Sequence, residues 1–203
     1  MEKLVKTAKN LDTVFKILSV AVNIGAICAV VGLGILAAGF AFDLPPEFIG
    51  TNWEVADLGF LTITVSGDSV PGLKPILGQA AAELALSLAC LVIVQRMIKC
   101  VRSILRPMTQ GAPFESSVST NLKRLAGYIL FLGIGLNCRE TISRLLLVKA
   151  FDLTRLLASD HITQLTFHYQ FNIGFVIASA AFLLLSYIFR YGEELQQLSD
   201  ETL

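Results

Sequence analysis

Apolar runs separated by polar, turn-rich segments dominate the 203-residue chain. The first run, Ile17 to Phe42, contains no charged residue, and the next two, at residues 76–98 and 122–148, flank a basic segment. A last, shorter run covers residues 173–189. Because about 20 apolar residues cross the hydrocarbon core of a bilayer, the pattern predicts an all-α bundle of four transmembrane helices. We expect these helices to form one integral membrane domain, residues 1–203.

The polar segments complete the predicted layout. Residues 99–121 form a hinge between two helical hairpins, residues 43–75 and 149–172 form external loops, and residues 190–203 form a helical tail. In these loops, Phe60 to Ser66 and Thr163 to Phe171 contain alternating apolar and polar residues, which is typical of strands. Since a lone strand is unstable, we expect the two strands to pair in a small external β element.

Small residues line one face of the first run. Gly25, Gly32 and Gly39 recur every seven residues, and Ala29 lies on the same face. Small residues let membrane helices approach closely, so this face is predicted to pack against another helix. Residues 1–16 mix lysines with apolar residues and predict an amphipathic helix on the membrane surface.

Composition and charge support a membrane protein and indicate its orientation. The chain is 54% hydrophobic and 16% charged, with a mean hydropathy of +0.68, which is too apolar for an ordinary soluble domain. A formal net charge of zero gives no support for direct nucleic-acid binding. Placing the termini and the basic segment from Arg96 to Arg124 on one side collects 11 of the 16 Lys and Arg residues there. This bias predicts that both termini are cytoplasmic.

Motifs for catalysis or nucleotide binding are missing from the sequence. We therefore predict no catalytic residue, no cofactor and no metal site, and a protein that is not an enzyme. His161 and His168 leave a metal site as a less favoured alternative. The serines that begin at Ser116 indicate a helix start rather than a phosphate site. The four cysteines lack metal-ligand spacing and are predicted to be free thiols.

Polar residues inside the predicted spans form a candidate intramembrane polar site: Glu83, Asn137, Arg139, Glu140 and Arg144. Charged groups at this depth are costly and usually pair or face water. Glu140 and Arg144 are four residues apart and are expected to pair along one helix. We expect Glu83 to lie at the depth of Arg139 and to bond Arg139 or Arg144. Such a pair either fixes helix register or binds an ion or small polar solute, and both alternatives stay open.

Two short motifs resemble a known family. The hinge contains QGAPFESSVSTNLKRLAGY, with Gly111, Pro113 and Phe114, and the tail contains FRYGEELQQLSDETL, with Phe189, Arg190, Gly192, Glu194 and Leu195. Together they resemble domain-of-unknown-function family 2975, small bacterial four-helix integral membrane proteins. The resemblance implies a bacterial inner-membrane protein of unassigned activity, often encoded beside a small helix-turn-helix regulator. The polar third run departs from the family pattern.

The favoured function is that of a membrane-anchored interaction or regulatory partner, because both motifs fall on the predicted cytoplasmic side. Its partners are then the lipid bilayer and a cytoplasmic protein, for which the resemblance suggests a small helix-turn-helix regulator, and a homo-oligomer is left open. The candidate docking residues are Gly111, Pro113, Phe114, Arg190, Gly192, Glu194 and Leu195. The alternative is a small transporter, channel subunit or immunity-type protein that uses the polar site.

The hinge motif also carries a structural prediction. We expect Phe114 to be buried against the inner ends of the second and third helices. Gly111 would permit the turn, and Pro113 would fix the entry into the following helix.

Overall fold

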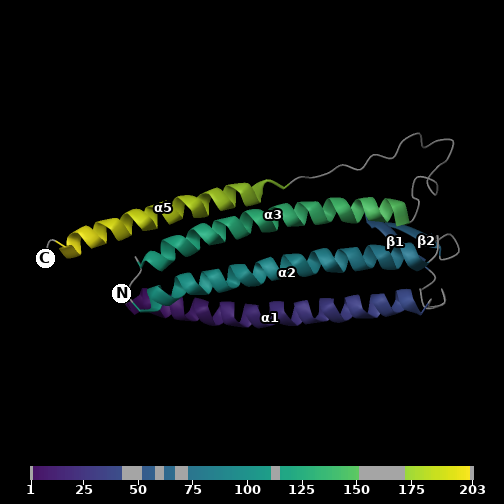
Figure 1. Cartoon of the computed structure of the whole chain (residues 1–203), viewed down its shortest axis with the longest axis horizontal. Helices are drawn as coiled ribbons and strands as arrows, with labels where there is room; N and C mark the ends of the chain where they lie inside the picture. Colours follow the sequence, from purple (N-terminus) through teal and green to yellow (C-terminus); the bar gives the residue numbers. More distant parts are fainter. Residues whose placement is uncertain are drawn as a thin grey trace. The chain divides into compact units, whose positions relative to one another are not determined.

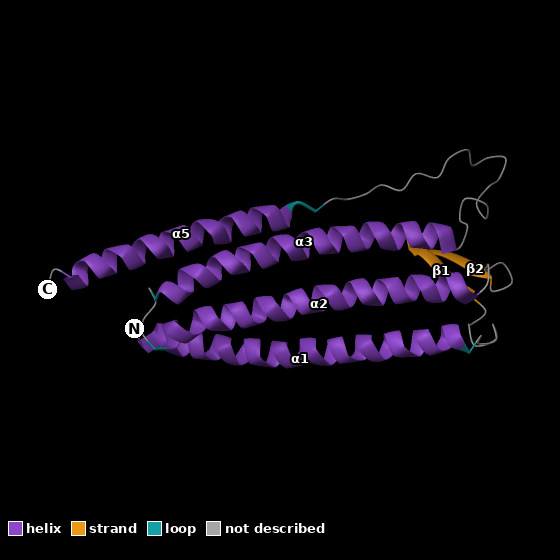
Figure 2. Ribbon diagram, viewed as in Figure 1, coloured by secondary structure: helices purple, strands orange, loops and turns teal. Residues whose placement is uncertain are grey.

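The computed structural model of the protein describes residues 2–42, 52–57, 62–66, 73–110, 115–150 and 172–201. Long helices make up nearly all of this part of the chain (Figures 1 and 2). They are α1 (Glu2–Ala41), α2 (Leu73–Thr109), α3 (Ser116–Ala150) and α5 (Gly174–Glu201). The predicted helical class is confirmed, and the four described helices cover the predicted spans except for Phe42 and Ile173 at the ends of two of them.

A short hairpin lies in the segment between α1 and α2. Strand β1 (Asn52–Asp57) pairs antiparallel with β2 (Thr62–Ser66), with an irregular register between Glu54 and Ala56. The predicted β element formed by two separate loops is not supported, because β2 takes a neighbour from its own loop. Closing such a short loop costs less chain entropy than joining distant segments. The other predicted strand, Thr163 to Phe171, lies outside the described residues.

The chain divides into two units. Unit 1 contains Met1–Cys28, Ala89–Asn137 and Phe171–Leu203, and unit 2 contains Ala29–Leu88 and Cys138–Gln170. Helices α1, α2 and α3 contribute residues to both units. The assignment of all 203 residues to a single domain stays a prediction.

Among the described helices, α1, α2 and α5 are long and apolar enough to cross a membrane, at Val5–Ala41, Lys74–Thr109 and Gly174–Ser199. Helix α3 is not in this group. Its uncharged run lasts only from Leu125 to Cys138, about 21 Å at 1.5 Å per residue, against a hydrocarbon core about 30 Å thick. The apolar pattern of the described helices therefore supports three spans, and it does not by itself support a fourth at α3.

Helices α1 and α2 are joined by polar contacts in unit 1. Arg102 Nε donates to Asp12 Oδ1 over 2.8 Å, and Gln95 Nε2 donates to Ser19 Oγ over 2.9 Å. On each helix the two contacts are seven residues apart, which keeps them on one face. Residues 2–16 continue the same α1 helix into residue 17 and beyond, so the predicted amphipathic segment is not a separate helix.

The predicted small-residue face of α1 does pack against α2. In unit 1, a Cβ added to Gly25 would contact the Leu91 side chain at 3.9 Å. In unit 2, a Cβ added to Gly32 would lie 3.2 Å from Leu84, and Ala29 and Gly39 are buried. A side chain at Gly32 would therefore push Leu84 away, which explains why a small residue is needed there.

Helices α3 and α5 pack together in unit 1 through serine hydroxyls. Ser186 Oγ donates to the Ser119 carbonyl over 2.8 Å, and Ser179 Oγ donates to the Ala126 carbonyl over 2.9 Å. Both serines are buried. One further heptad along α3, Gly133 is covered by Phe175. These contacts fix the register of α5 on α3.

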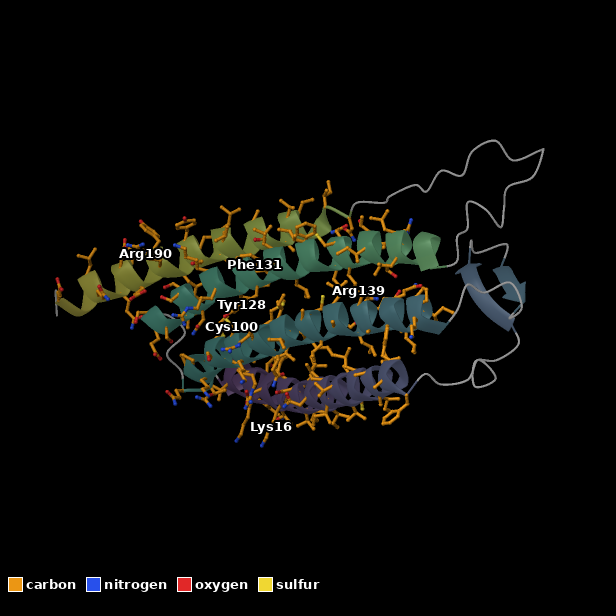
Figure 3. All side chains as sticks on the ribbon, turned by 45° about the vertical axis from the view of Figure 1, so that its right-hand side comes forward. Lys16, Cys100, Tyr128, Phe131, Arg139 and Arg190 are labelled. Atoms are coloured by element: carbon orange, nitrogen blue, oxygen red, sulfur yellow. The ribbon has the colours of Figure 1, made fainter. Side chains whose placement is uncertain are left out.

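The best-packed part of unit 1 lies at the hinge ends of α2 and α3. Its core consists of Cys100, Ile104, Val118, Leu122 and Leu125. Tyr128 packs against this core, as do Phe182 and Phe189 from α5; Figure 3 labels Cys100 and Tyr128. The cluster thus joins the hinge ends of α2 and α3 to the middle of α5.

Candidate functional site

The described part of the polar site in unit 2 centres on Glu83 of α2. Ser143 Oγ of α3 donates to Glu83 Oε1 over 2.5 Å, and Gln79 Nε2 donates to the same oxygen over 3.3 Å. Gln79 and Glu83 are four residues apart and so share one face of α2. All three side chains are half-buried. The cluster therefore satisfies a carboxyl group with hydroxyl and amide donors from two helices.

The expected bond between Glu83 and Arg139 or Arg144 is not formed among the described residues. Arg139 is exposed and is labelled on α3 in Figure 3. Arg144 pairs with Glu140 along α3, as the spacing predicted. A partner four residues away on the same helix needs no matching of two helices, whereas an interhelical pair does. Ser143 fills the place on Glu83 that was predicted for an arginine.

Asn137 belongs to unit 1 and serves a different contact. Its side chain donates to the Gly133 carbonyl over 2.8 Å and to the Asn172 carbonyl over 3.3 Å. Its Oδ1 accepts the Asn172 N–H over 3.1 Å. Asn172 Oδ1 in turn accepts the N–H of Gly174, the first residue of α5. Asn137 therefore holds the chain at the capped start of α5.

The candidate docking residues of the tail lie on one continuous helix, because α5 extends past Arg190 to Glu201. Arg190 Nε donates to Glu194 Oε1 over 3.3 Å, and both side chains are exposed. Leu195 is exposed and Gly192 is half-buried. The hinge residues Gly111, Pro113 and Phe114 lie outside the described residues, so the predicted burial of Phe114 stays a prediction.

The hinge end of unit 1 is rich in exposed cations. Lys99 and Arg106 of α2 are exposed, while Arg102 bonds Asp12. The hydrogen bond from Arg102 lowers the pKa of the Asp12 carboxyl and raises the pKa of the Arg102 guanidinium. Both residues lie outside the uncharged runs of their helices. The ion pair neutralises one positive charge at the hinge end, where the exposed cations Lys99, Arg106, Lys123 and Arg124 still outnumber the exposed carboxyl group of Glu115.

Cysteine thiols and metal-binding clusters are the remaining chemical candidates. The four cysteines are free thiols, and the buried Cys100 donates to the Asn121 carbonyl over 3.0 Å. Among the described ranges, no group of three or more His, Cys, Asp and Glu side chains is placed to hold a metal ion. His161 and His168 fall in a range that the structure does not describe.

The neutral hydrogen-bonding partners of these sites were not predicted from the sequence. Gln79 had a detectable signal, its four-residue spacing to Glu83. Little in the sequence pointed to Ser143, Ser179 or Ser186 as partners of another helix, because a serine in a helix commonly bonds the backbone of its own helix. The seven-residue step from Ser179 to Ser186, matched by Ser119 to Ala126, is the signal that a search for helix interfaces could have used.

No protein-family model, curated protein or solved structure matches the chain. The resemblance to domain-of-unknown-function family 2975 therefore stays a prediction based on the hinge and tail motifs.

Proposed function

We propose that the chain is a multi-pass protein of a bacterial inner membrane that acts as an anchored interaction partner. In this proposal α1, α2, α3 and α5 all cross the bilayer, with both termini and the hinge in the cytoplasm. The bias of Lys and Arg toward the termini and hinge supports this orientation. Support for α3 as a span comes from its polar residues, since Glu140 pairs with Arg144 and Asn137 bonds Asn172.

Labelling of introduced cysteines would test the number of spans. Ser116 at the start of α3 and Gln196 in the tail are both exposed. If α3 crosses the membrane, Ser116→Cys and Gln196→Cys label from the same side in a background without native cysteines. Labelling from opposite sides would show that only the other three helices cross, and the four-span proposal would fail.

The observation that carries the interaction role is the position of the packed core. Buried residues gather at the hinge ends of α2 and α3, around Val118. In the most apolar stretch of each candidate span, by contrast, only 6 to 11% is buried. A rigid surface loses less entropy when a partner docks. A packed end that carries exposed Lys99 and Arg106 is suited to binding a soluble protein with an acidic surface. The family resemblance suggests a small helix-turn-helix regulator as this partner.

Pull-down of detergent-solubilised protein tests this role. Lys99→Glu combined with Arg106→Glu should abolish partner capture, because both charges lie on the hinge end of α2. Lys16→Glu is the matched control, since Lys16 is an exposed cation of α1 outside the hinge. Equal capture by wild type and the double variant would rule out a hinge-docking role.

The Glu83 cluster favours a second candidate, a small transporter, channel subunit or immunity-type protein. Its support is a half-buried carboxyl group held by Ser143 and Gln79 inside a candidate span, since ionisable groups within membrane helices often mark solute pathways. Glu83→Gln should then abolish flux into proteoliposomes and leave partner capture intact. The interaction role instead predicts that Glu83→Gln keeps partner capture and that only the hinge variant, Lys99→Glu with Arg106→Glu, loses it.

A further inference from the structure

One exposed face of α5 contains apolar residues in alternating steps of four and three. The pattern runs through Ile177, Ala181, Leu184, Ile188, Tyr191 and Leu195, and its next position is Leu198. We call the six residues from Ile177 to Leu195 the α5 stripe. Every member of the α5 stripe is exposed; Ile188 is 63% and Leu195 49% accessible. Such a spacing is the seam pattern of a two-helix coiled coil.

The opposite face of α5 is already occupied. Phe182 and Phe189 pack on the hinge-end core, and Ser186 bonds the Ser119 carbonyl of α3. These contacts fix the rotation of α5 about its axis. The α5 stripe is therefore held away from α3 and cannot turn inward without breaking them.

Lipid does not account for the whole stripe. Leu184 and Ile188 belong to the predicted span, residues 173–189, where acyl chains can cover them. Tyr191 and Leu195 lie further along, in the acidic tail. Acyl chains end near a basic boundary such as Arg190, so Tyr191 and Leu195 need another cover.

We propose that a second copy of the chain covers the α5 stripe, with the two α5 helices parallel. A heptad seam is self-complementary, so the same surface on two copies forms a closed two-fold pair. Copies inserted alike in one membrane present their tails in the same direction, which selects the parallel arrangement. This step rests on the membrane anchoring in the proposed function; the hinge is left for the soluble partner.

The residues that flank the seam agree with this pairing. They include Tyr187, Gly192, Glu194 and Ser199, of which only Glu194 is charged. In a parallel pair the position of Glu194 faces that of Ser199 in the second copy, so no like charges oppose each other. Glu194 also bonds Arg190 within its own helix. The flanks thus lack the repulsion that would prevent self-association.

Oxidative cross-linking in native membranes tests the pairing. In a background without native cysteines, Leu195→Cys should give a disulfide-linked dimer, because Leu195 lies on the seam. Gln197→Cys, an exposed site on the same turn but away from the seam, should give none. Equal cross-linking at both sites, or none at Leu195→Cys, would overturn the proposal.

Native mass spectrometry provides a test that leaves the cysteines unchanged. Wild type should have twice the 22.0 kDa mass of one chain, and Leu195→Glu should have the mass of one. A monomeric wild type, or a dimer that survives Leu195→Glu, would contradict the seam. A soluble protein bound at this face of a monomer would identify a different occupant and would also overturn it. The cysteine labelling at Ser116 and Gln196 reports topology separately, so a failure of the dimer is distinguishable from a failure of the membrane orientation.

Discussion

The side chain of Asn137 and the backbone of Asn172 exchange two hydrogen bonds. The Asn137 amino group donates to the Asn172 carbonyl, and the Asn137 carbonyl oxygen accepts the Asn172 N–H. This arrangement uses both ends of the amide, so neither aspartate nor leucine reproduces it. Asn137, which was predicted to belong to a polar site, thus anchors the start of α5.

Asn137→Ala should lower the free energy of unfolding by about 1.5 to 4.5 kcal/mol, since it removes three side-chain hydrogen bonds that contribute about 0.5 to 1.5 kcal/mol each. Asn172→Ala keeps its backbone groups and loses only the cap on Gly174, at a cost of about 1 kcal/mol. Thermal unfolding in detergent measures both. Cys138→Ala, at the exposed neighbouring position, is the control. An Asn137→Ala variant as stable as this control would refute the anchoring role.

Gly133 and Gly127 of α3 offer a matched pair. A Cβ at Gly133 would fall well inside van der Waals distance of Phe175 Cβ and Cγ, whereas a Cβ at Gly127 meets nothing within 4 Å. Gly133→Ala should therefore destabilise the fold by about 1 to 3 kcal/mol through overpacking. Gly127→Ala should be neutral or stabilising by up to about 1 kcal/mol, because alanine is the better helix former. Similar melting temperatures for the two variants would show that α5 does not pack there.

The ion pair between Asp12 and Arg102 predicts a small pH dependence. Because Arg102 lowers the pKa of Asp12 in the folded protein, the unfolded chain takes up a proton first as pH falls. The contribution is therefore complete at pH values above the ordinary Asp pKa of about 3.9 and disappears as pH falls through the lowered folded pKa. Both side chains are about one-third accessible, so the contribution is at most about 1 kcal/mol and weakens in salt.

Asp12→Asn should remove this acid-dependent part of the stability. Denaturant titrations at several pH values, with wild type and Asp12→Asn in parallel, measure it. Glu115→Gln serves as the control because Glu115 is an exposed carboxyl group of the same unit. A wild-type profile that Asp12→Asn leaves unchanged would mean that the ion pair adds nothing to stability.

The sequence predicted those features that repeat along one helix. Glycines seven residues apart predicted the face of α1 that meets α2, and the spacing of Glu140 and Arg144 predicted their ion pair. The extended helix after Arg190 also followed from its pattern. These features were accessible because a helix brings residues three, four and seven apart onto one face, whatever the rest of the chain does.

Contacts between helices were harder to predict. Which residues meet depends on the rotation and axial shift of two helices, and neither can be derived from the sequence. Residue depth places Glu83 level with Arg139, but it does not determine which face of α3 turns toward α2. Similarly, β2 suited a distant strand in composition, yet its partner β1 is a few residues away. Alternation specifies a strand and not its neighbour.

A double-mutant cycle tests the contact between Glu83 and Ser143. Ser143→Ala removes a hydroxyl donor from a carboxyl group and should cost about 1.5 to 3 kcal/mol. Glu83→Ala removes the acceptor, so the two losses should be coupled by about 0.5 to 3 kcal/mol. The matched cycle pairs Glu83→Ala with Arg139→Ala, which should be additive because Arg139 is exposed and forms no bond to Glu83 in the described residues. Unfolding in detergent gives all four free energies of each cycle. If Glu83 were coupled to Arg139 while the Ser143 cycle was additive, Glu83 would form the interhelical ion pair and the contact with Ser143 would be contradicted.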